Sequence, residues 1–198
     1  MSAAAVVAGW DNFYVIVGSA ASGLTGLTFV VVALAADANM ARLPGLKIFV
    51  SPTVIHFSSA LWIALLAALP HPTRLSLGLS MLVSGLVGAL YTLRTMIRMR
   101  RMDRNDYVPV LEDWLWNGAL PEGSYLLLAV GGTLTGASPS LAGYLIGLAA
   151  LLLLFIGIHN AWDLAVWILA ERPSRRRKME AASEEQRRTG AEQTRTGG

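Results

Sequence analysis

Long hydrophobic stretches, separated by short polar segments, fill most of the first 170 residues of the chain. They predict helices over residues 13–36, 52–69, 75–97, 110–136 and 140–170. At about 1.5 Å per residue, each helix is long enough to cross a hydrocarbon core of about 30 Å. The pattern therefore predicts one all-α domain over residues 1–170, an integral membrane bundle of five transmembrane helices.

The direction of the helices follows from the arginines. The segment 110–136 is the weakest span, because carboxylates and a proline shorten its apolar run. Arginines gather in the loop 98–104 and in the tail 172–178, and the positive-inside rule assigns both to the cytoplasm. Both can lie there only if the segment 110–136 also crosses the membrane, with an expected kink at Pro121. We therefore predict an N-terminus outside and a C-terminus in the cytoplasm.

The composition supports this class. Hydrophobic residues make up 54% of the chain and charged residues 15%, where soluble proteins have about 25% charged residues. The chain has no cysteine, so disulfides, thiolate metal sites and iron–sulfur clusters are excluded. The net charge of +3 comes from arginines beside apolar spans, so we attribute it to membrane topology and not to nucleic-acid binding.

Residues 171–198 form a separate region that is rich in charged residues and poor in large apolar ones. Such a composition predicts a disordered cytoplasmic tail. Its basic run, Arg175–Lys178, is expected to bind anionic lipid headgroups, at about 1 kcal/mol per charge. A binding motif for a cytoplasmic partner is the alternative.

Small residues recur at intervals that place them on one helix face, which is typical of membrane helices that approach each other closely. These residues are Gly18, Ser22, Gly23 and Gly26 in the first span, Ser84 and Gly88 in the third, and Gly143 and Gly147 in the fifth. They predict either packing inside one bundle, which we favour, or the seam of a homo-oligomer.

Ionisable and amide side chains inside the spans are costly and need an explanation. The topology predicts that they gather in the cytoplasmic half of the bundle: His56, Arg94, Glu112, Asp113, Asn117, His159, Asn160 and Asp163. We favour a hydrogen-bond and salt-bridge network that fixes helix register. One alternative is a proton or ion relay. Another is a bound zinc, held by His56 and His159 with a carboxylate from Glu112, Asp113 or Asp163, or a haem held by the two histidines alone.

Four sequence stretches resemble a family of small polytopic bacterial inner-membrane proteins of uncharacterised activity. They are WDNFYVIVGSAASGLTGL (residues 10–27), SPTVIHF (51–57), LEDWLW (111–116) and NAWD (160–163). The resemblance implies a bacterial origin and a location in the inner, cytoplasmic membrane. It implies no activity.

No catalytic motif stands out, so the sequence favours a non-enzymatic protein without a cofactor. We expect an assembly or regulatory partner of another membrane complex. The alternatives are a channel or small-solute transporter that uses the polar cluster, and a metal- or haem-dependent membrane enzyme.

Overall fold

The computed structural model describes residues 3–7, 9–37, 44–101 and 111–166. The described part is helical and contains no β-strand, so the predicted all-α fold is confirmed. The predicted tail, 171–198, lies outside the described residues. In chain order the elements are α1 (Ala4–Val7), α2 (Asp11–Asp37), α3 (Pro44–Ala67), α4 (Arg74–Arg100), α5 (Leu111–Trp114), the π-helical turn η1 (Leu115–Ala119), α6 (Leu120–Leu134) and a last helix, Pro139–Val166.

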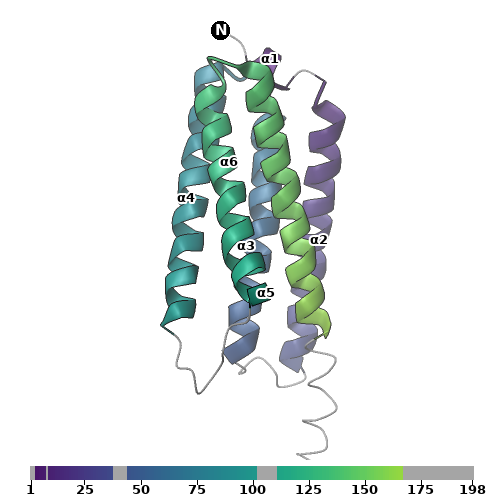
Figure 1. Ribbon diagram of the computed structural model, residues 1–198. Helices are drawn as coiled ribbons and strands as arrows, with labels where there is room; N and C mark the ends of the chain where they lie inside the picture. Colours follow the sequence, from purple (N-terminus) through teal and green to yellow (C-terminus); the bar gives the residue numbers. More distant parts are fainter. Residues whose placement is uncertain (1–2, 8, 38–43, 102–110, 167–198) are drawn as a thin grey trace, which may run out of the picture.

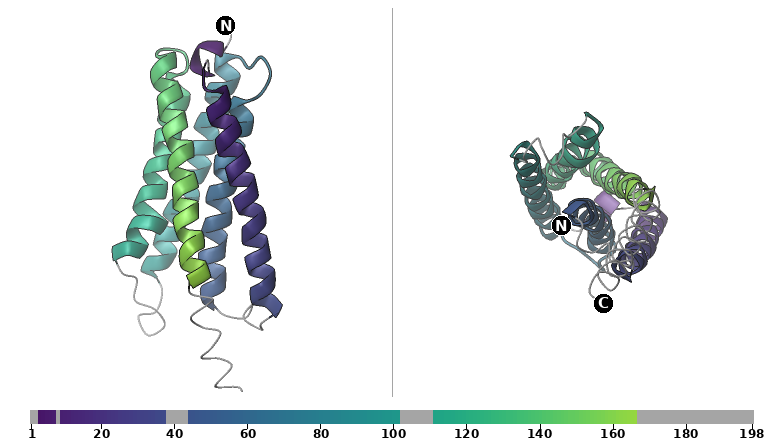
Figure 2. Two further views of the ribbon diagram at one scale, coloured as in Figure 1. Left: turned by 90° about the vertical axis from the view of Figure 1, so that its right-hand side faces the viewer. Right: turned by 90° about the horizontal axis from the view of Figure 1, so that it is seen from below.

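The long helices run side by side along one axis (Figure 1). Elements α5, η1 and α6 continue one another and are called the fourth helix below, so the expected number of five long helices is confirmed. The short α1 and the turns after α3 and α6 lie at the upper end, and α4 and the last helix finish at the lower end. Viewed from below, α3 lies inward, with the other long helices arranged around it (Figure 2).

In the part of the chain that the structure describes, three helices are long and apolar enough to cross a membrane: Asp11–Ala33, Arg74–Arg101 and Pro139–Val166. Pro52–Ala67 is a shorter apolar stretch of the same kind. Large hydrophobic side chains on these helices point outward, among them Ile16, Leu86 and Phe155. An apolar outer surface of this kind suits lipid as the surrounding solvent, because exposing so much apolar surface to water is unfavourable.

Helix α3 begins at Pro44, whereas the sequence predicted a start near residue 52. Proline fits the first turn of a helix, where an N–H would have no partner, so Pro44 is a suitable start. Pro52 lies inside the helix and is buried. The apolar stretch itself, Pro52–Ala67, starts where the sequence predicted, and His56 lies twelve positions after the first residue of α3, about 18 Å along the helix.

The fourth helix accommodates Pro121 through the π-helical turn η1. The ring of a proline clashes with the carbonyl four residues earlier and offers that carbonyl no hydrogen. Just before Pro121, the Leu120 N–H donates to the Leu115 carbonyl, five positions back. The proline therefore produces one wide turn, at the place where the sequence predicted a kink.

The tightest helix crossing joins α4 to α6 (Figure 1). A Cβ atom added at Gly85 would lie 2.6 Å from the Ala129 nitrogen, and one added at Gly132 would lie 2.6 Å from the Leu82 nitrogen. At Gly88 the Tyr125 ring fills the same space. Only glycine permits backbones to approach this closely, so these positions fix the distance between the two helices.

Other predicted packing glycines also meet neighbours. A Cβ at Gly18 would lie 3.2 Å from the Ala64 Cβ, where α2 crosses α3. Gly143 lies against the backbone of Val6, and Gly147 lies under the Trp10 ring. Close packing at these positions is therefore within a single chain.

The remaining part of the predicted α2 stripe faces outward. Ser22, Gly23 and Gly26 are exposed, and nothing lies within 4 Å of a Cβ atom added at either glycine. The sequence favoured packing inside one bundle for this face, but these residues do not pack against the other described helices. Their surface is free in the single chain.

Candidate functional site

The polar side chains of the bundle form two separate groups, one at the lower end and one at mid-depth. The first group, called the end cluster, consists of Glu112, Trp116, His159 and Asp163. His159 and Asp163 are one helical turn apart on the last helix and so share a face. The fourth helix supplies Glu112 and Trp116 opposite them.

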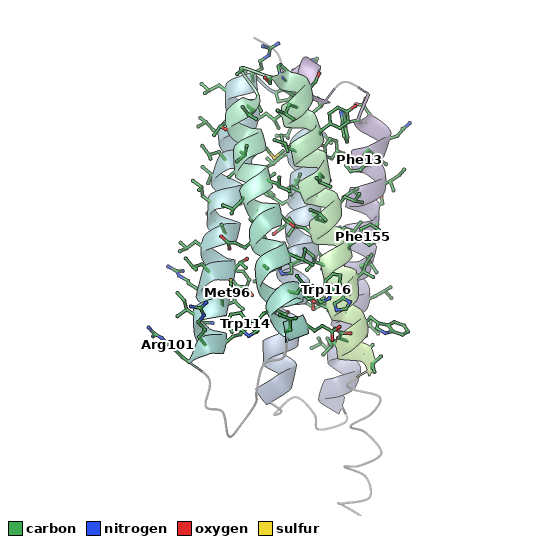
Figure 3. All side chains as sticks on the ribbon, in the orientation of Figure 1. Phe13, Met96, Arg101, Trp114, Trp116 and Phe155 are labelled. Atoms are coloured by element: carbon green, nitrogen blue, oxygen red, sulfur yellow. The ribbon has the colours of Figure 1, made fainter. Side chains whose placement is uncertain are left out.

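In the end cluster, the His159 ring lies flat on Trp116, with ring centroids 3.7 Å apart and planes inclined by 18°. The Nε2 atom of His159 is 3.1 Å from Asp163 Oδ2 and 3.9 Å from Glu112 Oε1. These are ion-pair distances, although neither contact has the alignment of a hydrogen bond. Figure 3 shows Trp116 on the lower part of the fourth helix, beside the last helix.

The second group is a chain of hydrogen bonds at mid-depth, called the His56 chain. Tyr125 brings its hydroxyl from α6 to within 3.2 Å of His56 Nδ1 on α3. The same hydroxyl is 2.9 Å from the Ser59 oxygen. His56 and Ser59 are three positions apart and therefore face the same way. His56 and Tyr125 are each only 1% exposed.

The two groups lie at different depths. The residues of the fourth helix that contact His159 and His56 are Trp116 and Tyr125, nine positions apart, which corresponds to a rise of about 13 Å. His56 does not share a partner with His159 or Asp163 among the contacts of the described residues. The sequence expected all of these groups in one cluster, and the structure divides them into two.

The other expected members of the cluster are spread around these groups. Arg94 is exposed on the side of α4, and Asn117 is half-buried in η1. Asn160 is buried with its amide nitrogen unpaired within the described part of the chain. The side chain of Asp113 lies outside the described residues.

Beside the His56 chain lies a groove of about 500 Å³ between α3 and α4, closed at its base by α6. It is called the α3–α4 groove below. Its lining residues are Ile55, Ser58, Ser59, Trp62, Ile63, Val83, Ser84, Val87, Gly88, Tyr91, Tyr125 and Leu128. Because Trp62, Val83 and Val87 are also strongly exposed, the groove opens on the side surface of the bundle.

One hydrogen bond crosses the groove. The Trp62 indole N–H donates to the Ser84 hydroxyl at 3.1 Å, and that hydroxyl donates to the Ser80 carbonyl at 2.7 Å. The Trp62 N–H and the Ser84 proton therefore both have a hydrogen-bond acceptor. The bond joins α3 to α4 on the upper part of the groove.

Sequence analysis named neither Tyr125 nor Ser59 as a member of the polar cluster. A signal for Tyr125 existed: tyrosine in membrane helices prefers the interface, so one in the middle of a span needs a hydrogen-bond partner. Glu122 was also left out of the predicted cluster. Its Oε2 atom is buried, and it has no hydrogen-bond partner among the described residues.

The arrangement bears on the predicted metal and haem sites. Among the described residues, no group of three or more histidine, aspartate or glutamate side chains is placed to hold a metal ion. His56 is bonded to Tyr125, and His159 is stacked on Trp116. The bond to Tyr125 uses the Nδ1 atom of His56, so a metal bound by this residue would be held through Nε2.

The chain matches no protein-family model, and no significant match was found among curated proteins or solved structures. The resemblance to the family of small inner-membrane proteins therefore stays a prediction. The two polar groups and the groove are the basis for a functional proposal.

Proposed function

We propose that this chain is a bacterial inner-membrane protein with five spans, an N-terminus outside and a C-terminus in the cytoplasm. The lower end of α4 carries Arg98, Arg100 and Arg101, which the positive-inside rule assigns to the cytoplasm. The Arg100 guanidinium lies 5.5 Å from the centre of the Trp114 ring, a cation–π contact suited to the interface. The short α1 lies at the opposite end (Figure 1).

We further propose that the protein binds a lipid-soluble ligand, taken from the bilayer, in the α3–α4 groove. The observation that carries this proposal is the groove itself, which has about 500 Å³ of space. Small-molecule sites are mostly apolar clefts of about 300–1,000 Å³ with a few polar groups. Lipid is the medium that reaches a groove opening on the apolar side of a membrane bundle.

The length of the groove favours a small or chain-like ligand over a helix of a partner protein. It extends over residues 55–63 of α3 and 83–91 of α4, which is about 12 Å along each helix. A transmembrane helix that docks side by side with the bundle has up to about 30 Å of length to pack. The groove matches only a part of that length.

We propose binding without catalysis. A serine nucleophile needs a base within hydrogen-bond reach. Within the described residues, the one imidazole beside the groove is that of His56, which is bonded to the Tyr125 hydroxyl. The proton or ion relay and the metal- or haem-dependent enzyme stay predictions, because no contact of the described residues favours either.

The test compares two neighbouring positions on α4. Val87 lines the groove, and Leu86 is equally exposed but does not line it. Val87→Phe should fill the groove and Leu86→Phe should not. The bound lipids of each purified protein are extracted and identified by mass spectrometry. We expect wild type and Leu86→Phe to retain the same co-purifying ligand and Val87→Phe to lose most of it. Equal ligand content in all three would refute the proposal.

A second candidate is the assembly or regulatory partner that the sequence favoured. The observation in its favour is the outward α2 face at Gly23 and Gly26, which the single bundle leaves without a neighbour. Faces of small residues let membrane helices approach closely. Gly23→Leu should then weaken co-purification of a membrane partner while the isolated bundle keeps its stability. An unchanged set of co-purifying proteins would remove this candidate.

A further inference from the structure

The walls of the α3–α4 groove carry no charge. None of the residues that line it is an aspartate, glutamate, lysine, arginine or histidine, and its polar groups are the hydroxyls of serine and tyrosine together with one indole. A charged headgroup at mid-depth would lack a counter-charge there, which is costly in a medium of low dielectric. A ligand with a neutral polar group avoids this cost.

The His56 chain leaves spare hydrogen-bonding capacity at Ser59, whichever nitrogen of His56 carries the proton. If Tyr125 donates to His56 Nδ1, then Ser59 donates to Tyr125 and both lone pairs of the Ser59 oxygen are free. If His56 Nδ1–H donates to Tyr125 instead, Tyr125 can donate to Ser59, which frees the Ser59 proton, or accept from Ser59 as well, which frees both lone pairs of the Ser59 oxygen. Ser59 lies on the groove wall in every case.

The Ser84 hydroxyl, which also lines the groove, has no proton to offer a ligand. Ser84 accepts from Trp62 and donates to the Ser80 carbonyl, which leaves one acceptor lone pair on its oxygen. Ser58, the neighbour of Ser59, also lines the groove but is exposed and is not part of the His56 chain. Ser59 is thus the hydroxyl that a buried chain holds in a fixed position.

We propose that the α3–α4 groove selects a long-chain lipid that carries an uncharged oxygen, a hydroxyl or a carbonyl, and that this oxygen hydrogen-bonds to Ser59. The inference rests on the proposed ligand-binding function and adds the chemistry of the ligand. A hydroxyl satisfies Ser59 in every proton arrangement, and a carbonyl satisfies it when the Ser59 proton is free. The hydrocarbon chain lies along the apolar walls that Val83, Val87 and Leu128 provide.

The experiment is photo-labelling in phosphatidylcholine nanodiscs. The probe is hexadecanol with a diazirine in its chain, and peptide mass spectrometry locates the label. The competitors are hexadecanol, hexadecan-2-one, hexadecane and palmitate. We expect label on α3 and α4 at the groove, with hexadecanol competing roughly 2- to 12-fold better than hexadecane, the factor that one net hydrogen bond gives. Competition by the ketone as well identifies Ser59 as the donor.

Two serine variants complete the test. Ser59→Ala keeps the bond between His56 and Tyr125 and should abolish the preference for hexadecanol over hexadecane. Ser58→Ala, the matched control, should retain it. Equal competition by hexadecane, best competition by palmitate, or loss of the preference in Ser58→Ala alone would overturn the inference while label in the groove still supported ligand binding. Label absent from the groove would overturn the proposed function itself.

Discussion

The crossing of α4 and α6 makes Gly85 highly sensitive to a single added methyl group. In Gly85→Ala the new Cβ would lie 2.6 Å from the Ala129 nitrogen and 2.7 Å from the Tyr125 carbonyl oxygen. Both contacts are with backbone atoms, so no side-chain rotation can relieve them. The helices themselves must move apart.

The size of the effect follows from these distances. Ordinary contact begins at 3.4 Å, so the Cβ is about 0.8 Å too close to the Ala129 nitrogen. If the helices separate to relieve this clash, gaps open elsewhere between them, and a gap of about 0.5–1 Å loses a quarter to a half of the dispersion energy of each contact. Overpacking of this kind costs about 1–3 kcal/mol. The better helix propensity of alanine returns about 0.5–1 kcal/mol in water. We expect a net loss of roughly 1–2 kcal/mol in the free energy of unfolding.

The measurement is reversible unfolding in mixed micelles with increasing sodium dodecyl sulfate, followed by circular dichroism. Gly23→Ala is the matched control, because it is the same substitution in a membrane helix with nothing within 4 Å of the new Cβ. It should be neutral or slightly stabilising. If Gly85→Ala proved as stable as Gly23→Ala, the close backbone contact between α4 and α6 would be refuted.

A cysteine replacing Ser138 should react with an impermeant maleimide added to cells, and one replacing Arg101 should react only after the membrane is opened; the reverse pattern contradicts the proposed orientation. Tyr125→Phe should lower the free energy of unfolding by about 1–3 kcal/mol, since it leaves the buried His56 Nδ1 without its partner. Adding His56→Ala should then cost less than the sum of the single changes, and an additive result would mean that the bond contributes little. His56→Ala and Asp163→Ala should be additive within about 0.5 kcal/mol, because the two residues share no partner; clear coupling in the same unfolding assay would place them in one network.

The number of helices and the end at which the arginines gather were predictable because hydropathy and charge are local properties of the sequence. The full length of α3 was not. The apolar stretch begins at Pro52, as predicted, whereas the helix begins at Pro44. Hydropathy marks where a helix is apolar, and a helix can extend well beyond that stretch.

The glycines illustrate a different limit. The regular spacing of Gly18, Ser22 and Gly26 shows that one face of α2 is smooth, but it carries no information about which helix meets that face. Gly85 and Gly132 lie at the close crossing of α4 and α6, and their contacts depend on how these two helices pack against each other. Such pairing is a property of the tertiary fold.

The same limit applies to the candidate site, and the fourth helix explains why. Trp116 and Tyr125 are nine positions apart, so a regular α-helix, turning about 100° per residue, would point them in opposite directions. One of them would then face lipid. The π-helical turn that precedes Pro121 takes up one extra residue and reduces the angle between them to roughly 90°. Trp116 can therefore reach His159 on the last helix while Tyr125 reaches His56 on α3. A proline that looked like a simple kink in the sequence is what allows one helix to complete both polar groups.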